Sequence, residues 1–129
     1  MKLHALVKVR CLLAVICSIL LFTAACHQPQ KTKKFTIGFS QCTGGDAWRR
    51  QMKVSMEGEL AFYPDMQLLY RDAENSSAKQ FADIEAFIHD KVDLLIVSPN
   101  EATPITPVVE KAFNAGIPVI VVDRKTSSS

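Results

Sequence analysis

The sequence predicts an α/β fold, a parallel doubly wound sheet whose strands and helices alternate as β-α-β-α-β-α-β. Two runs carry this prediction, Val92 to Val97 and Ile117 to Val122, and both are almost continuously apolar. Such runs are typical of strands buried on both faces of a sheet that helices cover. Helix-length segments separate the strand-length runs. Units of this kind wind right-handed into a parallel sheet.

The first two strands flank a helix that begins near Asp46. We expect the first strand over residues 35–40 and the second over residues 66–71, ending at Asp72. Asp46 is a suitable N-cap for a helix that runs to about residue 62. Apolar side chains recur within that helix at steps of four: Trp48, Met52, Met56 and Leu60.

The second helix begins at Ser76 or Ser77 and has the clearest helical pattern in the chain. Its apolar positions follow the i, i+3, i+4, i+7 spacing of one helix face: Ala78, Phe81, Ile84, Phe87 and Ile88. Thr103-Pro104 or Thr106-Pro107 opens the third helix, since proline suits the first helical turn. Gly116 is placed to end that helix.

The first 25 residues have the layout of a secretory signal peptide. Three basic residues precede fifteen uncharged ones, and Thr23-Ala24-Ala25 offers a small-residue cleavage site. Fifteen residues fall short of the roughly 20 that cross a bilayer. Export is therefore a stronger interpretation than an uncleaved membrane anchor. Residues 26–34 are polar and are expected to form a tether.

Charge and cysteine content narrow the possible partners. Beyond the signal, 12 basic and 13 acidic residues leave a net charge of −1, which gives no support to nucleic-acid binding. Cys26 follows Thr23-Ala24-Ala25 and resembles the lipidated cysteine of a bacterial lipobox, with Thr23 where that motif usually has leucine. We expect Cys26 to be lipidated. Cys42 then stands alone, so no disulfide framework is expected.

Several function classes lack their motifs in this sequence. Gly38 and Gly44-Gly45 do not fit the G-x-G-x-x-G spacing of dinucleotide binding, and neither a P-loop nor a G-x-S-x-G elbow occurs. The three histidines are too scattered to predict a metal site. Asp72 and Glu74 form a carboxylate pair that is more typical of a turn or cap than of a reactive site. We therefore expect no cofactor, no metal and no enzymatic activity in this segment.

Asp123 and Arg124 are candidate ligand-binding residues because they follow a buried strand. In open parallel sheets, ligands bind just beyond the carboxyl ends of the strands. A carboxylate accepts hydrogen bonds and a guanidinium donates them, which suits a ligand rich in hydroxyl groups; the alternative is an exposed ion pair. Ser98 ends the neighbouring run. Trp48 offers a flat apolar face to a sugar ring, and its alternative is packing in the core.

The chain resembles ribose-binding-type periplasmic proteins, which share a two-lobed fold with the effector domain of the lactose repressor. The residues that carry the resemblance are Ile37-Gly38-Phe39-Ser40, Lys91 to Pro99 and Gly116 to Arg124. It covers residues 35–125 and implies the first part of the N-terminal lobe of a type I periplasmic binding protein. Residues 126–129 would be a truncated tail.

A narrower resemblance is to the extracytoplasmic sensor domains of hybrid two-component histidine kinases that detect sugars or glycan fragments. Ser40-Gln41-Cys42, Trp48-Arg49 and Val97 to Ala102 carry it. It implies that Asp123 and Arg124 bind sugar hydroxyls, that Ser98 lines the cleft and that Trp48 stacks on the ligand, with Ser40 as a further contact. The implied partners are a small polyhydroxylated ligand, the membrane, and a kinase module or an ABC transporter permease.

Alternative uses of the module stay open at this point. It could feed a histidine kinase or serve as a substrate-binding lipoprotein of an ABC sugar transporter. An enzyme on the same fold, completed by a missing lobe, is a remote alternative. A lactose-repressor-type transcription factor would need a helix-turn-helix segment where the signal peptide lies.

The resemblance also predicts that the chain is incomplete. The family clamps its ligand between two lobes, and these residues would supply only part of the first one. We therefore expect a truncated or partial reading frame, located in the periplasm and tethered to the membrane. By itself it should bind ligand weakly or not at all, because apolar surface beyond the fourth strand would lack a cover.

Overall fold

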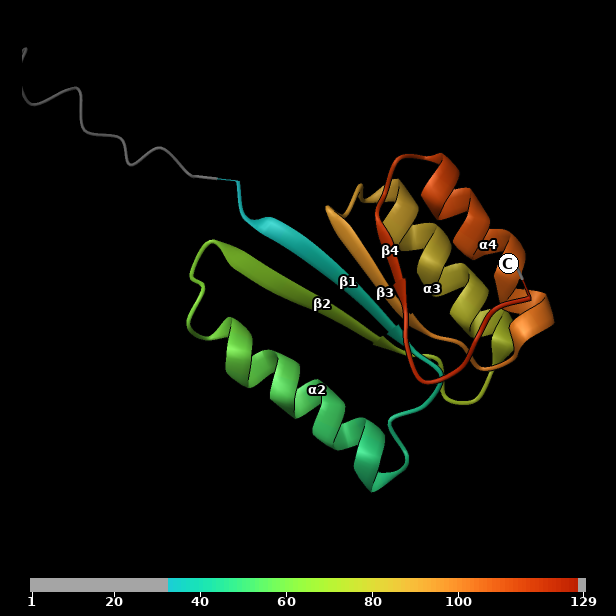
Figure 1. The fold of residues 1–129 in the computed structure, drawn as a ribbon, viewed down its shortest axis with the longest axis horizontal. Helices are drawn as coiled ribbons and strands as arrows, with labels where there is room; N and C mark the ends of the chain where they lie inside the picture. Colours follow the sequence, from blue (N-terminus) through green and yellow to red (C-terminus); the bar gives the residue numbers. More distant parts are fainter. Residues whose placement is uncertain (1–32, 128–129) are drawn as a thin grey trace, which may run out of the picture. The chain divides into compact units, whose positions relative to one another are not determined.

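Residues 33–127, which the computed structural model describes, form a four-stranded parallel sheet with helices on both faces (Figure 1). The strands and helices alternate as predicted, in the chain order β1 (Phe35–Gln41), α2 (Ala47–Leu60), β2 (Met66–Asp72), α3 (Ser77–His89), β3 (Leu94–Ser98), α4 (Ala102–Asn114) and β4 (Val119–Val121). Four predicted features lie wholly or mostly outside the described residues: the signal peptide, the tether, the lipidation of Cys26 and the end of the tail.

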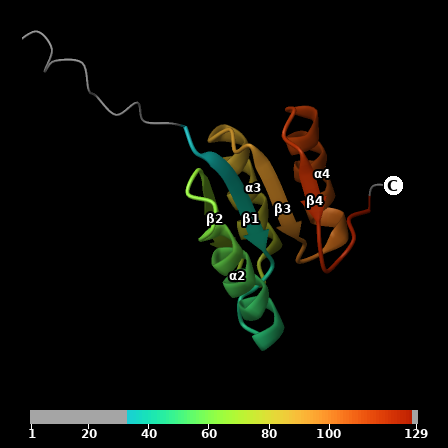
Figure 2. The same ribbon diagram turned by 60° about the vertical axis from the view of Figure 1, so that its left-hand side comes forward.

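The strand order β2-β1-β3-β4 determines which face each helix covers. The chain first moves from β1 to β2, and then reverses direction to add β3 and β4 on the other side of β1. Because parallel crossovers are right-handed, this reversal places α2 on one face of the sheet and α3 with α4 on the opposite face. Figures 1 and 2 show α2 separated from α3 and α4 by the sheet.

Local signals set the helix ends. Asp46 caps α2 by accepting a hydrogen bond from the Arg49 backbone N–H at 2.9 Å. Ser76, rather than Ser77, caps α3 in the same way through the Lys79 N–H. Gly116 follows the end of α4 with φ +84°, a conformation that glycine adopts at low cost.

Two predicted strands are shorter in the structure. β3 starts at Leu94 rather than Val92, and β4 covers Val119–Val121 rather than residues 117–122. The backbone N–H groups of Val92 and Ile117 donate to carbonyls at the ends of α3 and α4. They are therefore committed to helix termination and are unavailable to the sheet.

The hydrophobic core lies between the sheet and the α3–α4 layer. Its fully buried members are Ile84, Phe87, Leu95, Val97, Ile105, Val108 and Ala112. Gly38 in β1 lets the Phe87 ring approach the strand closely, since a Cβ at residue 38 would lie only 3.0 Å from Phe87 Cγ. Because Gly38 has no side chain, α3 can pack closely against the sheet at this point.

The opposite face is covered less completely. Helix α2 has no fully buried residue and packs mainly on β2. An apolar groove remains beneath it, lined by Ile37, Ile96 and neighbouring side chains. Ile120 of β4 is 47% exposed. The prediction that the last strand is buried on both faces is therefore wrong for β4, because α2 is the single helix on that side within residues 33–127 and lies toward the other edge.

Gly38→Ala tests the close contact between β1 and α3. The added methyl group would press on the Phe87 ring, and we expect it to lower the free energy of unfolding by about 1–3 kcal/mol in urea denaturation. Gly58→Ala is the control, because a Cβ at residue 58 of α2 meets nothing within 4 Å. Alanine there should raise the free energy of unfolding by about 0.5–1 kcal/mol. Equal stability of the two variants would contradict the proposed fit.

Candidate functional site

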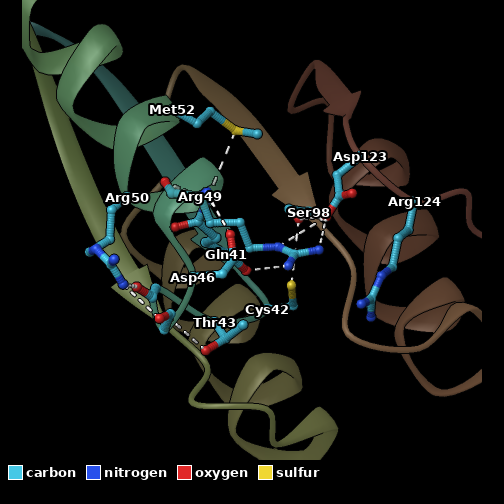
Figure 3. A network of polar contacts seen from close by, with 12 residues as sticks. Gln41, Cys42, Thr43, Asp46, Arg49, Arg50, Met52, Ser98, Asp123 and Arg124 are labelled. Atoms are coloured by element: carbon cyan, nitrogen blue, oxygen red, sulfur yellow. Dashed lines mark hydrogen bonds and ion pairs between the residues drawn. The ribbon is translucent and has the colours of Figure 1, made fainter.

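The carboxyl ends of the strands meet at one edge of the sheet. Gln41 at the end of β1 is level with Asp72 of β2 on one side and with Ser98 of β3 on the other. Val97 pairs with Val121 of β4. The loops that follow the four strands therefore leave the sheet side by side, and their side chains form the polar network in Figure 3.

Asp123 is the centre of this network. Its Oδ2 accepts hydrogen bonds from Ser98 Oγ at 3.0 Å and from Arg49 Nε at 3.1 Å, and it also pairs with Arg49 Nη2. The end of β3, the loop after β4 and the first turn of α2 are thus joined at one oxygen (Figure 3). No donor among residues 33–127 reaches Asp123 Oδ1, which remains available as an acceptor.

The backbone at Asp123 adopts an unusual conformation. Its φ is +68°, and the Arg124 N–H donates to the Val122 carbonyl at 2.7 Å. Together these define a γ-turn of the rare, strained form with positive φ. Aspartate is among the residues that tolerate positive φ best. A residue held in such a region costs on the order of 1–3 kcal/mol, and such residues cluster at functional sites.

Arg49 links Asp123 to the start of α2. While Nε and Nη2 face Asp123, Nη1 donates to Asp46 Oδ2 at 2.5 Å. The Arg49 side chain is only 13% exposed and that of Asp123 only 17%. The hydrogen bonds to Asp46 and Asp123 raise the pKa of Arg49, so its charge is permanent. The Arg49 backbone N–H and its guanidinium in turn hold the pKa of Asp46 below its ordinary value.

Arg124 and Trp48 are the exposed members of the predicted site. Arg124 Nη1 donates to the Asn100 carbonyl at 2.6 Å, and its other side-chain nitrogens have no partner within residues 33–127. Trp48 is 57% exposed, which does not fit the alternative of packing in the core. Its ring lies beside the guanidinium of Arg49, with Cζ 5.8 Å from the ring centroid. A polar group and a flat apolar surface therefore both face solvent at this edge.

Ser40 and Ser98 lie beneath this surface rather than on it. Both are fully buried. Gln80 of α3 donates to Ser40 Oγ at 3.3 Å and to the Ser98 carbonyl at 2.9 Å, and it accepts from the Asn100 N–H at 2.7 Å. The two serines thus belong to a buried support that ties the loop after β3 to helix α3.

A second buried layer lies under the loop that follows β1. Tyr70 donates to Gln41 Oε1 at 2.9 Å, and Gln41 Nε2 donates to the Arg49 carbonyl at 3.2 Å. Burial, together with the nearby charge of Asp72, raises the pKa of Tyr70 to about 12. Tyr70 therefore remains a protonated donor at neutral pH. Cys42 is buried beside them, with Sγ 3.7 Å from Ser98 Oγ.

Of the two carboxylates near the end of β2, that of Asp72 holds the backbone of the neighbouring loops. Asp72 Oδ2 accepts from the Gly44 N–H at 2.9 Å and Oδ1 from the Glu74 N–H at 2.8 Å. A Cβ on Gly44 would lie 2.8 Å from Asp72 Oδ2, so a larger residue there would displace the Asp72 carboxylate. Within residues 33–127 no group of three or more histidine, cysteine or acidic side chains could hold a metal ion.

Arg49 and Gln80 are the residues that the sequence-based site missed. Gln80 gives no local signal, because it occupies an ordinary position in an amphipathic helix. Arg49 had a weak one, since it follows Trp48 and lies three residues after the helix cap Asp46. Neither position indicates a partner without knowledge of which loops are neighbours.

Comparisons with known proteins show similarity to part of the periplasmic binding proteins. Residues 37–129 match the sequence profile of a family described as periplasmic binding protein domain. The chain is 37% identical over 92 residues to the ribose import binding protein RbsB of Bacillus subtilis (strain 168), covering 71% of this chain and 30% of that protein.

Solved structures of periplasmic binding proteins also resemble this chain. The fructose-binding periplasmic domain of a hybrid two-component system superposes with a TM-score of 0.71 at 45% identity, covering 74% of this chain and 31% of that one. An ABC transporter solute-binding protein from Bacillus halodurans C-125 with bound myo-inositol gives a TM-score of 0.69 at 34% identity, covering 78% and 34%. The chain therefore spans about a third of the length of these relatives.

Tyr70→Phe tests the buried layer under the site. The folded state holds the Tyr70 proton to about pH 12, whereas the unfolded chain releases it near pH 10. The hydroxyl's contribution to stability is thus present below pH 10 and lost as the pH rises toward 12. At pH 7 we expect Tyr70→Phe to cost about 1 kcal/mol in chemical denaturation. The difference from the wild type should shrink between pH 10 and 12, and a constant difference would contradict the pKa assignment.

Proposed function

The chain belongs to the ribose-binding-type periplasmic binding protein family, and we propose that it supplies part of one ligand-binding lobe of an extracytoplasmic receptor for a sugar or other small polyhydroxylated ligand. The observation that carries this proposal is Asp123, whose Oδ2 is held by Ser98 and Arg49 while Oδ1 stays available. Arg124 beside it has side-chain donors that meet no partner among the described residues. Hydroxyl groups both donate and accept, so a sugar satisfies both side chains.

The proposed ligand contacts are Asp123, Arg124 and Trp48. Asp123 accepts from ligand hydroxyls, Arg124 donates to them, and the exposed Trp48 ring covers the C–H face of a sugar. Ser98 and Ser40 act from below, because both are fully buried. We thus assign the two serines to the support of the site rather than to its surface.

The relatives support this ligand class. They include proteins described as binding fructose, ribose and myo-inositol, all of which carry several hydroxyl groups. The family is typically non-enzymatic, and its domain implies a location outside the cytoplasm. The described residues contain no helix long and apolar enough to cross a membrane. Tethering through the signal segment and a lipidated Cys26 stays a prediction.

We propose that the lobe serves as the sensory input of a histidine kinase. The 45% identity to the fructose-binding domain of a hybrid two-component system supports this use. The second candidate is a substrate-binding lipoprotein of an ABC sugar transporter. The 37% identity to a ribose import binding protein and the similarity to a myo-inositol-bound transporter protein favour it.

Asp123→Asn tests the ligand contact. A partial lobe is expected to bind weakly, so the ¹H–¹⁵N NMR titrations of the full chain use D-fructose at millimolar and higher concentrations (~1 mM upward). We expect shifts at the amides of Asp123 and Arg124 and at the Trp48 indole N–H. The apparent dissociation constant obtained from these shifts should rise at least tenfold (~10×) in the asparagine variant, since that variant loses the charged acceptor. The control Asp65→Asn changes a carboxylate just before β2, at the opposite end of the strands, and should leave the titration unchanged. Equal titrations of the wild type and Asp123→Asn would refute the contact.

The coding DNA beyond codon 129 distinguishes the two uses. A sensor predicts a continuing frame that encodes a second α/β lobe, then a membrane span and a kinase module. A transport protein predicts a stop after the second lobe. A true stop directly after codon 129 would leave no second lobe to close on a ligand, and we would then withdraw ligand binding as the function.

A further inference from the structure

We propose that Arg49 is the positioning residue of the ligand site, fixing the Asp123 carboxylate so that Oδ1 faces the ligand. The inference rests on the proposed function and extends it to a residue of α2. Arg49 Nε and Nη2 both face the same oxygen, Oδ2, which also receives the Ser98 hydroxyl. With three donors on one oxygen, rotation of the carboxylate would break all of these contacts at once.

Both the backbone and the side chain of Arg49 are held by hydrogen bonds. Its backbone N–H donates to Asp46 Oδ1, while its Nη1 donates to Asp46 Oδ2. Its backbone carbonyl accepts from Gln41 Nε2 at the end of β1. The guanidinium is therefore anchored to the helix cap through Asp46, while the Arg49 backbone is anchored to the sheet through Gln41 (Figure 3).

The strained backbone at Asp123 explains why the site needs this anchor. A γ-turn with φ +68° is strained and persists only where its surroundings hold it. The Ser98 hydroxyl supplies a single hydrogen bond from an uncharged donor. The ion pair with Arg49 joins side chains that are only 13% and 17% exposed, and it adds a charged donor that salt screens less than it would screen a fully exposed one.

The geometry requires arginine rather than any cation. A guanidinium presents its donors in a rigid planar fork and can serve two carboxylates at once, whereas the ammonium group of lysine is a compact point charge. Arg49→Lys thus keeps the charge and the helix propensity but loses the bridge from Asp46 to Asp123. Arg50→Lys is the matched control, since Arg50 donates to the carbonyls of Gly44 and Gly45 and does not contact Asp123.

The first measurement needs no ligand. In ¹H–¹⁵N spectra of the full chain, Arg49→Lys should shift the amides of Asp123 and Arg124 while the amides of α3 and α4 stay in place. Arg50→Lys should leave the Asp123 and Arg124 amides unchanged. Unchanged amides at residues 123 and 124 in Arg49→Lys would overturn the positioning role, whether or not any sugar binds.

The second measurement is a double-mutant cycle with D-fructose as the probe. We expect Arg49→Lys to weaken binding roughly tenfold, and the double variant with Asp123→Asn to bind no more weakly than Asp123→Asn alone. Effects that multiply would show that Arg49 acts independently of Asp123 and would overturn the inference. If the wild type does not bind fructose, the proposed function fails for this sugar, while the amide shifts still decide whether Arg49 positions Asp123.

Discussion

The parallel pairing of β1 with both β2 and β3 is the constraint on which the rest of the structure depends. It aligns Gln41, Asp72 and Ser98 at one edge of the sheet. The pairing of β3 with β4 brings the segment that contains Asp123 to the same edge. Arg49 and Asp123 are 74 positions apart in sequence and still form an ion pair. The common edge of the sheet is what brings these two side chains within hydrogen-bond distance.

The two faces of the sheet contribute differently to this edge. Under α3 and α4 the packing is close, with Phe87 against Gly38. The α2 face is looser, and β4 leaves Ile120 half exposed. The buried support of the site comes from the well-packed side, through Gln80 of α3. The exposed Trp48 and the anchor Arg49 come from α2, so the site combines a firm base with an accessible surface.

A satisfied polar network holds a strained backbone at the candidate site. Among the described residues, every buried side-chain nitrogen and oxygen has a hydrogen-bond partner. The bonds of Gln80 to the Ser98 carbonyl and the Asn100 N–H fix the loop after β3. That fixed loop supplies the Ser98 hydroxyl to Asp123. The positive φ of Asp123 is therefore stabilised by direct contacts from β3 and α2, and α3 supports the β3 end from beneath.

The sequence by itself determined the alternation of strands and helices, the cap Asp46, a cap at Ser76 or Ser77, the helix end at Gly116, and the position of Asp123 just beyond a strand. These features follow from local periodicity and from the conformational preferences of single residues. Both depend only on residues that are close in sequence. Only the tertiary structure decided that Arg49 holds Asp123, that Ser40 and Ser98 are buried and that one face of β4 is open. Those outcomes depend on the order of strands in the sheet, because contacts between distant segments leave no pattern in either segment alone.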